Sequence, residues 1–87
     1  MTDQSHDEEP TLADDLFHAG TAFLMRSQWD YAVKTLTQAL EAYRRDGNAR
    51  DAARTRGNLG SAYRRQGRWD AAIDAFRESR EQFQRLG

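Results

Sequence analysis

The 87-residue sequence contains no cysteine and a single proline, Pro10. Without cysteine there are no disulfides and no thiolate metal ligands, and a reducing compartment is the expected location. No apolar run approaches the roughly 18 residues that a membrane-spanning helix needs, and the first ten residues are polar and acidic rather than signal-like. The sequence therefore indicates a soluble, cytoplasmic protein. Its scarcity of proline and richness in alanine and arginine favour helices.

A 40-residue internal offset is the strongest pattern in the chain. Aligning residues 11–47 with residues 51–87 gives nine identical pairs in 37 positions. They include Gly20/Gly60, Trp29/Trp69, Asp30/Asp70, Ala32/Ala72 and Gly47/Gly87. A period of this length, with helical spacing inside each unit, is typical of stacked supersecondary units that form a core between neighbours.

Helical periodicity divides each unit into two helices, which we expect at about residues 12–26, 30–45, 49–66 and 70–86. Thr11 with Asp14 resembles a capping box at the first start, and Gly47 and Gly67 are expected to end helices. In the first helix the predicted inward stripe is Leu12, Leu16, Ala19, Gly20 and Phe23. The sequence therefore predicts an all-α fold of two antiparallel helix-turn-helix hairpins. Residues 1–10 are predicted to be a disordered acidic tail.

The repeated glycines Gly20 and Gly60 lie inside predicted helices, where glycine costs about 1 kcal/mol relative to alanine. We expect Gly20 and Gly60 to permit close helix approach, opposite Ala32 and Ala72. The repeated tryptophans, Trp29 and Trp69, are expected to fill the core around them.

The repeated residues resemble the tetratricopeptide repeat family, in its longer 40-residue type. Leu59-Gly60, Tyr63, Gly67-Arg68-Trp69-Asp70, Ala72 and Phe76 match the family pattern in the second unit, as do Gly20, Phe23, Trp29-Asp30, Ala32, Leu36 and Ala39 in the first. The resemblance covers residues 11–87 as two repeats, 11–47 and 51–87. It implies a short right-handed α-solenoid. The chain departs from the pattern at Arg56, Ser79 and Arg80.

The resemblance also implies a non-enzymatic protein–protein interaction module that binds a peptide or partner helix in a concave groove. The groove-lining residues would be Asp14, His18, Thr21 and Met25 from the first helix and Arg54, Asn58, Ser61 and Arg65 from the third. In this family an Asn at the place of Asn58 often binds a ligand's backbone. Arg54 and Arg65 flank it and favour an acidic partner. The acids at residues 7–9 offer a competing occupant in cis. A chaperone-type carboxylate clamp is disfavoured, because the first unit has Asp14 and His18 where the clamp needs a basic residue.

Other functions have less support in the sequence. Residues 1–43 hold eight acids and two basic residues, whereas residues 44–87 hold eleven arginines and six acids. The arginines make nucleic-acid binding an alternative, but they point several ways around their helix. No nucleophile–base pair, metal-ligand spacing or phosphate loop is present, so no catalytic residue, cofactor or metal is predicted.

The fourth helix carries an apolar face, with Phe76, Phe83 and Leu86, that would normally meet another repeat. Three interpretations stay open. Further repeats cover it, a second copy covers it, or Ser79 and Arg80 make it polar enough to act as a cap. The first two are the basis of a structural or self-assembly alternative to peptide binding.

Overall fold

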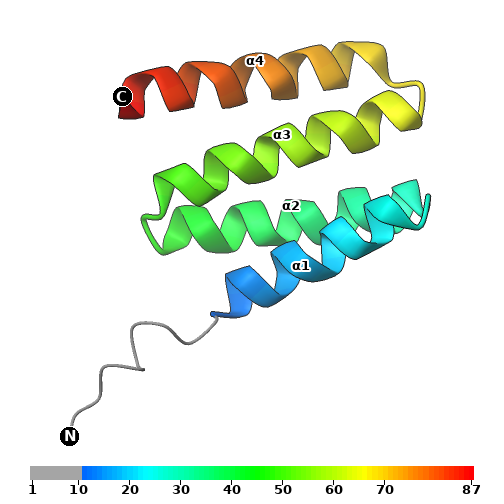
Figure 1. Cartoon of the computed structure of the whole chain (residues 1–87), viewed down its shortest axis with the longest axis horizontal. Coiled ribbons are helices and arrows are strands. Elements are labelled where there is room, and N and C mark those ends of the chain that lie inside the picture. The colour runs from blue at the N-terminus through cyan, green and yellow to red at the C-terminus, as the bar shows by residue number, and fades with distance from the viewer. Residues whose placement is uncertain (1–10) are drawn as a thin grey trace, which may run out of the picture.

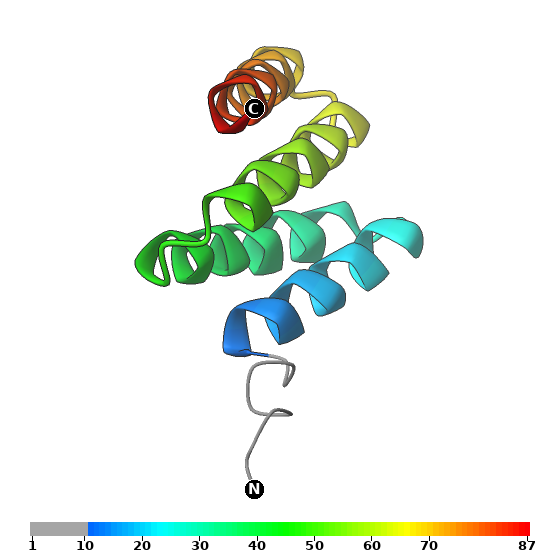
Figure 2. The ribbon, with the colours of Figure 1, turned by 60° about the vertical axis from the view of Figure 1, so that its left-hand side comes forward.

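The computed structural model describes residues 11–87, and the predicted acidic tail at residues 1–10 lies outside the described residues. Four helices make up the described chain: α1 (Leu12–Met25), α2 (Trp29–Arg45), α3 (Ala49–Arg65) and α4 (Trp69–Leu86). They run antiparallel in sequence order, α1 on α2 and α3 on α4, and α3 also packs on α2 (Figure 1). The all-α prediction of two stacked hairpins is confirmed. Figure 2 shows α1 and α4 at opposite ends of this stack.

A side-chain cap begins the first helix of each hairpin, α1 and α3. At α1 the Thr11 hydroxyl accepts from the Asp14 backbone N–H at 3.1 Å, and the Thr11 backbone N–H donates back to the Asp14 carboxylate at 3.2 Å. This confirms the predicted capping box. At α3 the Asn48 side chain accepts from the Asp51 backbone N–H. These bonds satisfy backbone donors that have no partner inside the helix.

The first three helices end in the same turn. The backbone N–H of Gln28 donates to the Phe23 carbonyl at 2.9 Å, as Asn48 does to Tyr43 and Arg68 to Tyr63. This six-to-one bond is the Schellman motif, which requires a left-handed residue one position earlier. Gly47 and Gly67 supply it with φ of 73° and 80°, as predicted, but the first turn uses Ser27 at φ 63°.

Ser27 therefore adopts a backbone conformation that glycine adopts more easily. A residue other than glycine in the left-handed region costs about 1–2 kcal/mol. Replacing it with glycine removes this cost, but part of the gain is lost because glycine loses more conformational entropy on folding. We expect Ser27→Gly to raise the free energy of unfolding by about 0.5–1 kcal/mol in urea titration. Gly67→Ser is the matched reverse change and should lower it by about 1 kcal/mol. A change of the same sign in the free energy of unfolding for both variants would contradict this interpretation.

Close helix approach at Gly20 and Gly60 is confirmed, and the side chains nearest to them are larger than the predicted alanines. A Cβ built on Gly20 would lie 2.6 Å from Leu36 Cγ, and one on Gly60 would lie 2.8 Å from the Phe76 ring. Ala32 and Ala72, the predicted partners, lie one turn earlier in α2 and α4. Leu36 and Phe76, which lie one turn later, need the space that the glycines leave.

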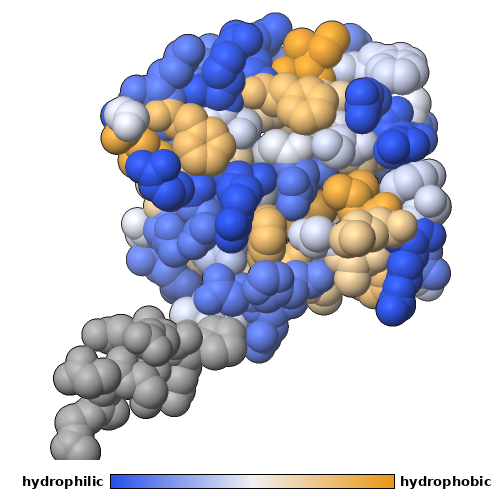
Figure 3. All heavy atoms as spheres, viewed as in Figure 1, coloured by the Kyte–Doolittle hydropathy of each residue, from blue (hydrophilic) through white to orange (hydrophobic). Residues whose placement is uncertain are grey.

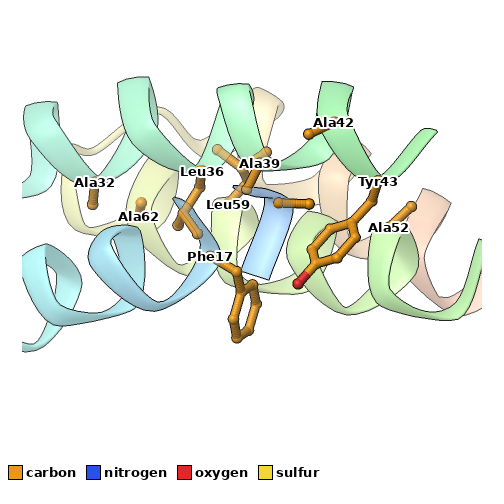
Figure 4. Packing of buried hydrophobic residues seen from close by; sticks show 10 residues of the cluster. Phe17, Ala32, Leu36, Ala39, Ala42, Tyr43, Ala52, Leu59 and Ala62 are labelled. Carbon is orange, nitrogen blue, oxygen red and sulfur yellow. The ribbon is translucent and has the colours of Figure 1, made fainter. Parts of the chain in front are cut away.

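The core lies between α1, α2 and α3. Leu36, Ala39 and Leu59 meet near its centre, and Tyr43 extends its hydroxyl toward the α1 side, near Phe17 (Figure 4). The predicted inward stripe of α1 is partly wrong, because Leu12 and Ala19 are exposed. The buried residues of α1 are Ala13, Phe17 and Gly20.

In the second repeat the predicted burial of Trp69 is wrong, and Ser79 does not support the cap interpretation, one of the three left open. Trp69 is 62% exposed rather than part of the core, whereas Trp29 is half-buried. Ser79 does not form a polar outer cap, because it is buried inside the hairpin and its hydroxyl donates to the Ala53 carbonyl at 2.8 Å. Ile73 and Phe76 on α4 are exposed, although the Phe76 ring also lies against Gly60 on α3.

Candidate functional site

The eight residues predicted to line a groove lie on α1 and α3, which are neighbours in the stack. We call this surface the α1/α3 face: Asp14, His18, Thr21, Met25, Arg54, Asn58, Ser61 and Arg65. The two helices are joined directly at its centre, where the Asn58 side-chain amide donates to the Thr21 hydroxyl at 3.3 Å. Both residues are half-buried. Two of the predicted site residues, Asn58 and Thr21, are therefore in contact across the two helices.

Asp14 is already engaged by the protein. Its carboxylate accepts a 2.5 Å hydrogen bond from the Tyr43 hydroxyl and also completes the cap at Thr11. The bond from Tyr43, followed by the cap, holds the pKa of Asp14 below its usual 3.8. Burial and the same bond raise the pKa of Tyr43 well above 10. Asp14 therefore ties α1 to the end of α2 and has a structural role at the edge of the face.

This bond predicts a pH-dependent contribution to stability. Because the pKa of Asp14 is lowered by folding, its contribution is present above the unfolded value of 3.8 and is lost as pH falls through the folded value. The raised pKa of Tyr43 adds stability that is present below pH 10 and is lost as pH rises through the folded value. Tyr43→Phe should cost about 1 kcal/mol at neutral pH. Denaturant titrations across pH should show the advantage of wild type over the variant shrinking at low and at high pH, and a constant gap would contradict this account.

Arg54 is held in place at one end of the face. Its guanidinium lies 4.5 Å from the centre of the Phe17 ring and 3.1 Å from the Asp51 carboxylate. The His18 ring packs edge-on against the same phenylalanine, with centroids 5.6 Å apart. A cation over an aromatic face keeps its N–H donors at the ring's edge, where an anion can reach them.

A shallow pocket of about 350 Å³ lies at the other end. Its walls come from the end of α1, the first turn, the start of α2 and the end of α3: Leu24, Met25, Ser27, Trp29, Ser61, Arg64 and Arg65. The Arg65 guanidinium lies 5.4 Å from the centre of the Trp29 ring. The pocket thus combines apolar walls with two arginines that have no acidic partner within 4.0 Å among residues 11–87.

Five contributors to this face were not among the predicted site residues: Phe17, Leu24, Ser27, Trp29 and Arg64. Phe17 aligns with Gly57, so the repeat comparison gave no signal for it. The row Ala13, Phe17, Gly20 and Leu24 has helical spacing and is the signal that could have found it. Trp29 was assigned to the core, and its half-exposed ring forms a pocket wall instead.

The other arginines of α3 and the following turn point elsewhere. Arg56 faces α4, where it donates to Gln82 at 2.8 Å and pairs with Glu78 at 3.4 Å. Arg68 stacks over Tyr63. The predicted divergence of the arginines is confirmed, so they form no continuous basic stripe. Figure 3 shows hydrophilic side chains over most of one side of the molecule, with apolar areas over α4 and near the α1–α2 turn.

A family model described as tetratricopeptide repeat matches residues 7–85. The chain therefore belongs to the tetratricopeptide repeat family. Comparisons with curated proteins and with solved structures gave no significant match. Repeats of this family are generally non-catalytic scaffolds, and membership supports a role in protein–protein interaction.

Two further findings concern the described residues. None of the four helices is long and apolar enough to cross a membrane. Residues 11–87 also hold no group of three or more His, Cys, Asp or Glu side chains that could bind a metal ion.

Proposed function

We propose that this chain is a non-enzymatic, cytoplasmic binding module whose α1/α3 face holds an acidic segment of another protein. The observation that carries the proposal is the arrangement on α3. Arg54 and Arg65 stand at the two ends of the face, and Asn58 lies between them. Two cationic anchors separated by a backbone-binding amide suit an extended or helical segment with acids at both ends.

Asn58 has the donors and acceptors for such a segment. One amide N–H is used on Thr21, while its Oδ1 makes no hydrogen bond within residues 11–87. That oxygen can accept from a ligand's backbone N–H and so add affinity without reading the ligand's sequence. Thr21 and Ser61, both half-buried beside it, offer further hydroxyl contacts.

The pocket at Trp29 gives the face an apolar end. Met25 is 80% exposed above it, and an unbranched thioether adapts to differently shaped side chains. We therefore propose a ligand with an apolar residue next to an acid, with the acid on Arg65. His18 contacts the ligand at the opposite end, while Asp14 stays on Tyr43.

The proposal is tested by fluorescence titration, with Trp29 as the reporter in a Trp69→Phe background. Acidic peptides from a charge-varied library should bind, and the same peptides with Lys in place of Asp and Glu should not. Asn58→Ala/Arg65→Ala should weaken binding about tenfold or more, since charge-assisted bonds are lost. Arg45→Ala, an exposed arginine on α2, is the matched control. Indifference to peptide charge, or equal binding by the double variant, would overturn the proposal.

A structural role is the second candidate, and the exposed apolar face of α4 favours it. Ile73, Phe76 and Phe83 are at least one-third exposed, and a row of exposed large apolar side chains marks an interaction surface. Nucleic-acid binding is less favoured, because the arginines of α3 diverge around the helix. It predicts a steep loss of affinity with salt, which the titrations would detect.

A further inference from the structure

The two ends of the stack expose apolar rows whose counterparts in the middle are buried. On α4, Ile73, Phe76 and Phe83 are exposed, whereas Leu36 and Tyr43, which align with Phe76 and Phe83, are buried on α2. The row on α2 is covered from two sides, because both α1 and α3 pack on α2. Within residues 11–87 α4 packs on α3 alone, where Phe76 lies against Gly60, so no second helix covers its row.

The α1 helix has the matching row. On α3, Ala52, Leu59 and Ala62 are buried in the core that α3 shares with α2. Their equivalents at the 40-residue offset are Leu12, Ala19 and Ala22, and all three are exposed on α1. Leu12 is 68% exposed. The row on α1 is thus small and apolar, like the row with which α3 covers α2. No part of residues 11–87 covers the row on α1.

We propose that two copies of this chain associate head to tail, with α1 of one copy packing on α4 of the next as α3 packs on α2. The α2–α3 contact is the template. Both sides of the new contact carry residues equivalent to those in the template, and both sides are exposed. The α4 face would then be covered by a second copy of the chain.

Two large exposed side chains, one from each end of the stack, pair in this arrangement. In the template, Arg65 lies over Trp29. The equivalent residues are Met25, which is 80% exposed, and Trp69, which is 62% exposed. Met25 stands where the template has Arg65, so the new contact has no cation. A thioether against an indole is still a favourable contact. The exposure of Trp69, unexpected from its repeat, follows from the missing neighbour.

The charges that differ from the template are also complementary. Asp15 aligns with Thr55, which is fully buried, and Arg80 aligns with Leu40. Thr55 lies eight residues after the turn at Gly47 and Leu40 seven before it, so antiparallel pairing places them within about one helical turn of each other. Asp15 of one copy therefore meets Arg80 of the next. A carboxylate removed from water needs such a partner.

This association joins two different surfaces and does not close by itself, so it predicts open chains of molecules rather than a two-fold dimer. The interface shares Met25 with the α1/α3 face, and its other contacts lie outside the proposed peptide site. Its test therefore uses residues outside the proposed peptide contacts.

Sedimentation velocity over a range of concentrations tests the proposal, with Trp69 emission in a Trp29→Phe background as a second readout. Wild type should grow in mass with concentration, and Trp69 emission should shift to the blue as its ring is covered. Ala22→Glu blocks the α1 row and Ile73→Glu blocks the α4 row, both at exposed positions. Each should be monomeric alone, and their mixture should form a heterodimer and stop there. Gln38→Glu, an exposed change on α2, is the control and should behave as wild type.

The charge pair gives a second, independent measurement. Asp15→Arg or Arg80→Asp alone should weaken association about fivefold, and the double exchange should restore it. A wild type that stays monomeric at millimolar concentration would overturn the proposal. So would an Ala22→Glu variant that still dimerises, because that result indicates symmetric pairing of two α4 faces.

Discussion

Gly20→Ala is expected to lower the free energy of unfolding by about 2 kcal/mol, although alanine is the better helix former. The added methyl would lie 2.6 and 2.7 Å from Leu36 side-chain carbons and 3.2 Å from the Leu36 backbone nitrogen. Leu36 is fully buried, so it has no free space to move into. The overpacking strain therefore exceeds the gain of about 1 kcal/mol in helix propensity.

Gly60→Ala is the matched control for this change. Its methyl would lie 2.8 Å from the Phe76 ring, a comparable clash with a different neighbour. Phe76 is 40% exposed and can rotate toward solvent, so we expect a loss below about 1 kcal/mol. Urea unfolding followed by circular dichroism measures both. Equal losses at the two glycines would show that exposure of the neighbour does not decide the cost.

Leu36→Ala should be the most damaging single truncation in the core, with a loss of about 3 kcal/mol. Leu36 is the largest aliphatic side chain without solvent exposure and lies at the contact of α2 with α1. For a domain of this size such a loss is a large part of the total stability. The expected result is a low-temperature, broadened thermal transition by circular dichroism.

A double-mutant cycle separates local packing from general weakening of the fold. In Gly20→Ala/Leu36→Ala the new methyl occupies part of the space that the leucine leaves. The combined loss should therefore be smaller than the sum of the single losses by about 1 kcal/mol or more. Leu59→Ala with Gly60→Ala is a useful comparison, since Gly60 touches Phe76 rather than Leu59. Additive losses at Gly20 and Leu36 would contradict the close approach.

The sequence predicted the helices well because their boundaries are determined locally. Thr11 and Asp14 cap a helix by side-chain chemistry that needs no tertiary contact, and Gly47 and Gly67 end helices through their own backbone freedom. Ser27 was missed because a serine at a left-handed position has no local signal. The 40-residue offset aligns Ser27 with Gly67, and the repeated turn bonds show that it takes the place of the glycine.

Packing partners were less predictable, because they depend on how the helices cross. Periodicity indicated that Gly20 lies at a helix contact, but it did not distinguish Ala32 from Leu36 one turn away. Similarly, identity between Trp29 and Trp69 suggested equal burial. Their environments differ because α3 follows the first repeat, whereas no described helix follows the second. A repeat alignment shows which positions are equivalent, and neighbouring helices decide their exposure.

The candidate site was likewise predictable only in part from the sequence. Row spacing on two helices selected residues that the fold brings together: Asn58 lies beside Thr21, and Arg65 and Met25 line one pocket. Spacing along α1 gave no indication that Tyr43, 29 residues away in the chain, occupies the Asp14 carboxylate. Nor did it show that Phe17 and Trp29 support the two arginines. Those aromatic supports are what hold two cations at fixed places on the α1/α3 face.

Backbone amide shift mapping by NMR is the most direct test of the proposed α1/α3 binding face. An acidic peptide selected by titration should shift the signals of Thr21, Asn58, Ser61 and Arg65, together with the indole N–H of Trp29. The signals of the outer face of α4 should stay unchanged at protein concentrations below self-association. Shifts confined to α4, or spread evenly over all four helices, would contradict the account.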